Sequence, residues 1–222
     1  MREIVLDTET TGLDPKDGHR IVEIGCVELL NHVPTGRSFH RYVNPERSMP
    51  EEAYQVHGLS EEFLAQHPPF RDVVDEFLDF IGADRLVIHN AEFDIRFINA
   101  ELKALGKPPL ACAFEDTLTL ARRRFPGAQA SLDALCRRFE IDLSARTKHG
   151  ALLDCELLAA VYLELIGGRQ PGFELMLDAT AAAVATAIAR SFREPRPHQA
   201  SEEELAAHAA MLQKLKQPLW LS

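Results

Sequence analysis

The chain has 222 residues, a formal net charge of −10 and 46% hydrophobic residues, which suits one ordinary domain with an appendage. Acidic Glu3 near the start argues against a signal peptide, and no apolar stretch approaches the ~20 residues of a membrane span, so a cytoplasmic protein is expected. Four widely spaced cysteines without a Cys-x-x-Cys pair argue against a zinc site or a disulfide framework.

The first part of the chain predicts three strands. They are Glu3 to Thr8, Ile21 to Leu29 and Ser38 to Val43, and the turn Asn31 to Gly36 joins the last two as a hairpin. Mixed with the helices predicted downstream, these strands indicate a layered α/β domain.

Two carboxylates close the first predicted strand, within Asp7-Thr8-Glu9-Thr10-Thr11-Gly12. Asp7 and Glu9 are two positions apart, so on a strand both side chains leave the same face. Carboxylates held side by side repel each other unless cations bind them, and oxygen ligands favour Mg²⁺ or Mn²⁺. An isolated Asp-x-Glu is more often a polar strand edge. A cation site is therefore indicated only if further ligands come from elsewhere in the chain.

The middle of the chain supplies one partner. Ser60 opens a short helix, and Phe70 to Ile81 has apolar residues at helical spacing. Leu86 to Ile88 predicts another strand, and the helix that follows carries Asp94 in its first turn. A carboxylate there also suits the helix dipole, which is the simpler interpretation.

A second partner lies further on. A short strand from Ala111 to Phe114 and a helix around Leu132 to Phe139 precede a long helix that contains Asp154 among apolar residues. A buried carboxylate without a partner is costly, so a cation or a hydrogen-bond network is expected around it. His149 lies about one turn before that helix, and alone it would be a cap or a surface residue.

Together these residues resemble the DEDDh 3′–5′ exonucleases, which have an RNase H-like fold with a mixed β-sheet flanked by helices. The resemblance covers residues 1 to 166. It implies that Asp7, Glu9, Asp94 and Asp154 hold two divalent cations, Mg²⁺ or Mn²⁺, around a phosphodiester. It also implies that His149, on an accessible loop from Leu143 to Gly150, is the general base.

The resemblance and the local sequence also suggest residues that contact the terminal nucleotide. Val56-His57-Gly58 resembles the family segment that contacts the terminal base, and for Phe93 a core position is equally favoured. His89 is expected to be structural. The candidate substrate residues are Thr10, Gly12, Leu13, Val56, His57, Asn90 and Phe93.

The composition changes after Ile166, and residues 167–200 are expected to form a linker. Its Gln170, Phe173 and Leu175 resemble a sliding-clamp-binding motif, whereas the Ala-rich residues 178–192 have no functional interpretation. The alternative for the motif is a flexible segment with incidental apolar residues.

Residues 201–222 are expected to form a partner-binding tail. Ser201 to Glu204 is a capping box, and the helix should run to about Lys216 before the apolar end around Trp220. The resemblance to proofreading members of the family implies docking on the PHP domain of a polymerase subunit. Packing against the chain's own domain is the alternative. Whether a small theta-like subunit also binds stays open.

The acidic net charge suggests that the chain alone binds a single-stranded 3′ end of DNA weakly and relies on a polymerase for phosphate contacts. Two alternatives remain. One is a DEDDh exoribonuclease, RNase T-like or oligoribonuclease-like, which would not need the C-terminal extension. The other is a non-catalytic tether between clamp and polymerase, which would have no use for four converging carboxylates.

Overall fold

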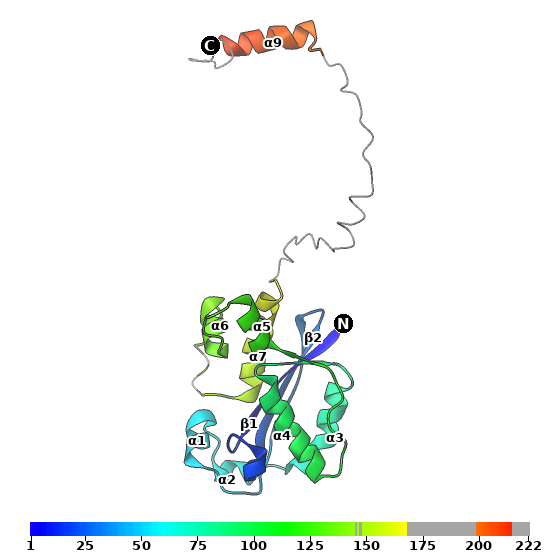
Figure 1. Ribbon diagram of the computed structural model, residues 1–222, viewed down its shortest axis with the longest axis vertical. Coiled ribbons are helices and arrows are strands. Elements are labelled where there is room, and N and C mark those ends of the chain that lie inside the picture. The colour runs from blue at the N-terminus through cyan, green and yellow to red at the C-terminus, as the bar shows by residue number, and fades with distance from the viewer. Residues whose placement is uncertain (145, 147, 168–198, 215–222) are drawn as a thin grey trace. The chain divides into compact units, whose positions relative to one another are not determined.

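A computed structural model describes residues 1–144, 146, 148–167 and 199–214. The chain divides into two units, Met1–Phe173 and Glu174–Ser222. The first unit is a layered α/β domain in which helices cover a central sheet (Figure 1). In the described ranges, no helix has the length and apolar character needed to cross a membrane.

The sheet of the first unit has the strand order β3-β2-β1-β4-β5. β1, β2 and β3 pair antiparallel, whereas β4 and β5 run parallel to β1. The mixed sheet predicted from the sequence is therefore confirmed. The strands are β1 Arg2–Thr10, β2 Ile21–Leu30, β3 Val33–Tyr42, β4 Arg85–Ile88 and β5 Phe114–Asp116.

Helices α3 (Phe70–Ile81) and α4 (Ala91–Ala104) cover one face of the sheet. Their apolar stripes pack on alternate strand residues, such as Ile4 on β1 and Ile88 on β4. The sequence predicted α3 with the same bounds, because its apolar residues recur at helical spacing.

Helix α7 (Ala151–Leu165) covers the opposite face, where Cys155 and Leu158 meet Val5 of β1. Helices α5 (Thr117–Arg124) and α6 (Leu132–Arg138) pack on the far side of α7 through a third apolar cluster. Since α7 is covered on both sides, its sequence is apolar nearly all round.

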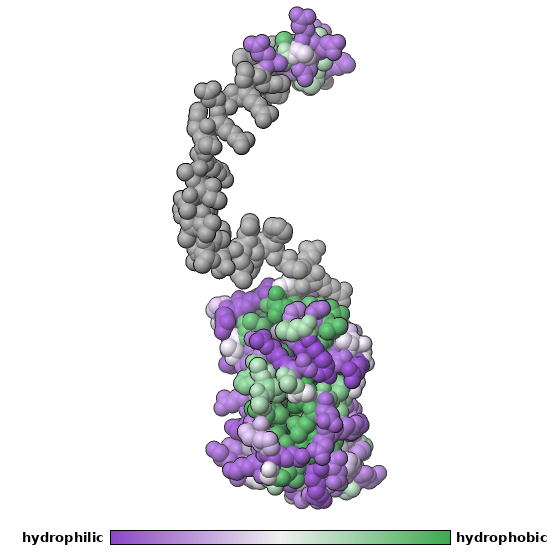
Figure 2. Space-filling model, turned by 90° about the vertical axis from the view of Figure 1, so that its right-hand side faces the viewer, coloured by the Kyte–Doolittle hydropathy of each residue, from purple (hydrophilic) through white to green (hydrophobic). Residues whose placement is uncertain are grey.

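Short helices fill the connections. η1 (Pro15–Asp17) follows β1, and α1 (Glu51–His57) and α2 (Glu61–Leu64) lie between β3 and α3. Ser60 accepts a hydrogen bond from the backbone N–H of Phe63, which confirms it as the residue that opens α2. On the face of the first unit drawn in Figure 2, hydrophilic residues surround an area of apolar ones.

The described part of the second unit is helix α9, Glu202–Leu212. Its capping box is formed, because Ser201 and Glu204 each bond the other's backbone N–H. Leu205 and Met211 are exposed on it. The helix was expected to reach Lys216, but it ends at Leu212.

Other bounds also differ from expectation. The strand expected at Ala111 to Phe114 lies later, at Phe114–Asp116, where the residues are in register with Leu86 to Ile88 of β4. Strand β3 begins at Val33, so the turn before it is shorter than predicted. The expected linker motif and tail residues lie outside the described residues: Gln170, Phe173, Leu175, the Ala-rich segment and Trp220.

Close packing of α7 on β2 depends on Gly25. A Cβ atom at this position would lie 2.4 Å from the backbone carbon of Ala151, nearer than atoms can approach. We expect Gly25→Ala to lower the free energy of unfolding by about 1–3 kcal/mol or more, because backbone rather than a flexible side chain must move. Urea unfolding followed by circular dichroism measures this.

Gly150→Ala is the matched control, because a Cβ at Gly150 meets nothing within 4 Å and the backbone there is extended. An equal loss in both variants would show that the contact between Gly25 and α7 is not the cause.

Candidate active site

The first two carboxylates come from the end of β1. Val5 packs under α7, and side chains two positions apart leave the same face of a strand, so Asp7 and Glu9 also point to the α7 side. Asp7 pairs in register with Gly25, the residue that lets α7 approach. The close packing of α7 therefore brings this helix near both carboxylates.

Asp94 enters from the first turn of α4, as predicted. The turn before it depends on Asn90, which has a left-handed backbone with φ 66° and whose N–H donates to Asp116 at 2.9 Å. Asp94 is buried, and its Oδ1 accepts the backbone N–H of Thr8 at 3.0 Å and the Thr8 hydroxyl at 2.7 Å. These bonds attach α4 to β1 beside the first two carboxylates.

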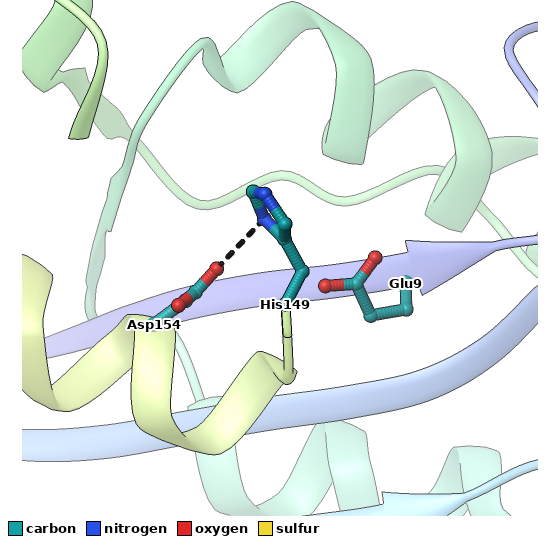
Figure 3. A group of neighbouring side chains, drawn as sticks. All are labelled: Glu9, His149 and Asp154. Carbon is teal, nitrogen blue, oxygen red and sulfur yellow. Dashed lines mark ion pairs between the residues drawn. The ribbon is translucent and has the colours of Figure 1, made fainter. Parts of the chain in front are cut away.

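Asp154 lies in the first turn of α7, and His149 lies two residues before the helix begins (Figure 3). His149 Nδ1 is 3.3 Å from Asp154 Oδ2, and the imidazole is half exposed. Glu9, His149 and Asp154 offer ligand atoms that all lie within 4.8 Å of one another. The His149 backbone N–H also donates to the carbonyl of Val56 in α1 at 3.3 Å.

One cleft, of about 590 Å³, collects the residues that the sequence predicted to carry the chemistry. Leu13, Asn90 and Phe93, predicted to contact substrate, also line it. The predicted catalytic residues that line it are Asp7, Glu9, Asp94, His149 and Asp154.

Burial and mutual repulsion dominate the electrostatics of this cleft. Burial raises the pKa of Asp7 well above its usual value, and the charges of Asp94 and Glu9 raise it further. Burial, with the charge of Glu23, raises the pKa of Glu9 to about 8. Burial also raises the pKa of Asp94 to about 7 although Thr8 bonds to it. The negative charge here is therefore poorly compensated.

Asp154 differs from the other three. Burial acts to raise its pKa, but the hydrogen bonds and the positive charge of Arg146 leave the pKa below its usual value. Arg146 Nε donates to Asp154 Oδ1 and Arg146 Nη2 to Asp154 Oδ2, both at 2.6 Å. Within the described ranges, no arginine, lysine or histidine forms an ion pair with Asp7, Glu9 or Asp94.

These observations fit a hard divalent cation. Oxygen donors from three elements converge, and positive charge placed among them would offset the burial that raises the pKa values of Asp7, Glu9 and Asp94 and the repulsion that raises those of Asp7 and Glu9 further. Carboxylate donors suit Mg²⁺ or Mn²⁺ better than a softer metal.

A second cleft, of about 510 Å³, shares Thr8, Glu9, Leu13 and Phe93 with the first. Leu13 and Val56 are 80% and 47% exposed, so large apolar residues face solvent. The other predicted substrate residues that line this second cleft are Thr10, Gly12 and His57.

Several of these residues also have structural roles. His89 Nδ1 lies 2.9 Å from the buried Thr117 hydroxyl, in keeping with a structural histidine. Phe93 packs on Phe97 with ring centroids 4.9 Å apart, yet it lines both clefts, so the core and contact interpretations both apply.

Sequence reasoning missed Arg146, Thr8 and Glu23. Arg146 lies eight residues before Asp154, a spacing with no regular structural meaning outside a helix, so nothing marked it as a partner. Thr8 lies between the two strand carboxylates on the opposite face, and its contact with Asp94 depends on where α4 sits. Glu23 acts on Glu9 across the β1–β2 pair, where the two lie in register.

The fold and the cleft have counterparts among known proteins. The family model RNase_T, described as "Exonuclease", matches residues 4–162. A solved structure of "Exonuclease X in complex with 5' overhanging duplex DNA" is 28% identical, with a TM-score of 0.59 over 74% of this chain and 90% of that chain. The nuclease domain of 3'hExo, a DEDDh family member bound to rAMP, shares the fold at 20% identity and a TM-score of 0.65, covering 74% and 91% of the two chains.

Two bacterial relatives are described as DNA polymerase III subunit epsilon. The Salmonella typhimurium protein is 48% identical over an alignment of 223 positions, which covers 95% of this chain and 92% of the relative. The Rickettsia conorii protein is 56% identical over 180 residues, which cover 79% and 78%. The chain therefore belongs to the exonuclease family and, within it, to the DNA polymerase III epsilon subunits.

Proposed function

We propose that the carboxylate cleft hydrolyses the terminal phosphodiester at the 3′ end of a mismatched DNA primer, with two divalent cations, Mg²⁺ or Mn²⁺, as cofactors. The observation that carries the proposal is the convergence of Asp7, Glu9, Asp94, Asp154 and His149 in one cleft. These residues come from β1, α4 and the start of α7, so only the folded chain assembles them.

Asp7, Glu9, Asp94 and Asp154 would hold the cations. Such ions, when bound, activate water and stabilise negative charge on phosphate oxygens. The chain's own contribution is to fix the four carboxylates. The sheet fixes the spacing of Asp7 and Glu9, and Thr8 orients Asp94 through two hydrogen bonds.

His149 would take the proton from the attacking water. It reaches the cleft from a half-exposed position and lies within hydrogen-bonding reach of Asp154. An imidazole is suited to the task because its unperturbed pKa, ~6.5, lies near physiological pH.

The second cleft would hold the terminal nucleotide. Leu13 and Val56 offer exposed apolar surface against which a base can stack, while Thr10, Gly12 and His57 line the cleft beside Glu9. Asn90 and Phe93 both line the carboxylate cleft, and there they would contact the DNA strand.

The likeness to epsilon subunits supports a proposal for the partners. The Salmonella typhimurium relative, which matches nearly the full length, is described as a subunit of DNA polymerase III. We place this chain in a bacterial cytoplasmic replisome, with Gln170, Phe173 and Leu175 on the beta clamp, and α9 with Trp220 on the PHP domain of the alpha subunit. A theta-like subunit is a further candidate partner.

The decisive test is release of 3′ nucleotides from a mismatched primer–template, in Mg²⁺ or in EDTA. We expect release by the wild type in Mg²⁺ only, and loss of activity in Asp7→Ala, because a cation ligand is removed. An RNA primer run in parallel tests the exoribonuclease alternative. No release by the wild type, with or without the polymerase subunit, would favour the tether.

His149→Ala should lower the rate by ~10²–10⁴, because a general base contributes about this much. Binding of Mn²⁺, measured by titration calorimetry, should survive because the carboxylates remain. His67→Ala, which changes a histidine that lines neither cleft, is the control. An unchanged rate in His149→Ala would remove this residue from the mechanism.

Glu9→Gln tests the raised pKa. The folded chain binds a proton at Glu9 up to about pH 8, whereas the unfolded chain releases it near the ordinary value of 4.5. The folded state therefore binds more protons in this window, so the contribution of Glu9 to stability falls as pH rises from about 4.5 to about 8. Glutamine does not titrate and avoids this loss.

Thermal melts in EDTA should show Glu9→Gln gaining stability over the wild type as pH rises through that window. Saturating Mg²⁺ should remove the gain, because the cation stabilises the charged carboxylate. A difference independent of pH would mean that Glu9 already ionises normally in the folded chain.

A further inference from the structure

Arg146 is the basic side chain with the most contacts in the carboxylate cleft. Only 8% of its side chain is exposed, and its guanidinium donates to both oxygens of Asp154 at 2.6 Å. Arg146 also pairs with Asp133 of α6. A guanidinium held in this way supplies fixed positive charge to the acidic cleft.

The same guanidinium reaches the proposed base. Arg146 Nη2 lies 2.7 Å from His149 Nδ1. Arginine can only donate, so Nδ1 accepts this bond with its lone pair, and the ring proton of a neutral imidazole is then on Nε2. In this arrangement neither ring nitrogen has a free lone pair for a proton from water.

A divalent cation bound by Asp154 would need one of the carboxylate oxygens that Arg146 engages, and the two positive charges would repel each other. Movement of the guanidinium away from Asp154 would also release Nδ1 of His149, because one Nη2 atom bonds both side chains. Binding of the cation and freeing of the base are thus coupled through one residue.

Resting on the function proposed above, we propose that Arg146 is a positioning residue that competes with the divalent cation for Asp154 and holds His149 inactive until the cation displaces it. Arg146 takes no part in bond making. It acts through the carboxylate and the imidazole that it contacts.

The test is direct binding of Mn²⁺ to the full chain, measured by electron paramagnetic resonance, in wild type and Arg146→Met. We expect at least roughly tenfold tighter binding in the variant. At an effective dielectric constant of ~20, repulsion between charges a few ångströms apart exceeds the ~1.4 kcal/mol that corresponds to tenfold. The thermal stabilisation by Mn²⁺ should also be larger in the variant.

A purely supporting role for Arg146 gives the opposite result. If Arg146 only oriented Asp154, its removal would weaken Mn²⁺ binding by ~10–100-fold, as loss of groups that orient metal ligands does. Weaker or unchanged binding would overturn the proposal. Arg137→Met, which removes an exposed partner of the same Asp133, is the matched control and should leave the affinity unchanged.

Arg146→Lys keeps the charge but loses the two-pronged bond, so its affinity should lie between wild type and Arg146→Met. Should Arg146→Met not fold, this variant decides: tighter binding than wild type supports the proposal, and equal or weaker binding overturns it. If the wild type itself bound no Mn²⁺, the proposed function would fail, which is a separate outcome.

Discussion

Repulsion among buried carboxylates is the constraint on which the rest of this structure depends. Burial raises the pKa values of Asp7, Glu9 and Asp94, and the charges of neighbouring carboxylates raise those of Asp7 and Glu9 further. Left alone, such a cluster favours protonation or separation of its members. The fold prevents separation, and a divalent cation is the natural source of compensating charge.

Several elements, which enter the cleft from different directions, keep the carboxylates together. The pleat of β1 sets the distance from Asp7 to Glu9, and two hydrogen bonds from Thr8 hold Asp94. Gly25 allows the backbone of α7 to rest on β2, which brings Asp154 over the sheet. Each contact is ordinary packing or hydrogen bonding, and together they keep like charges near one another.

The sequence predicted the sheet, the α3 bounds and the helical positions of Asp94 and Asp154, because period and turn chemistry are local signals. It predicted the five catalytic residues through a resemblance to a family, and the folded chain brings these residues together in one cleft. It could not predict Arg146, whose contacts with Asp154 and His149 depend on the path of an irregular loop. The end of α9 was also missed, since helix ends depend on local capping and fray.

The pair between Arg146 and Asp154 has a consequence for biosynthesis. Part of the positive charge that the cleft requires is encoded in the polypeptide, so α7 can dock on the sheet before any ion arrives. Folding and metal loading are then successive events, unlike in zinc fingers, where the metal is needed to fold. A newly made chain would be a complete scaffold first and an enzyme afterwards.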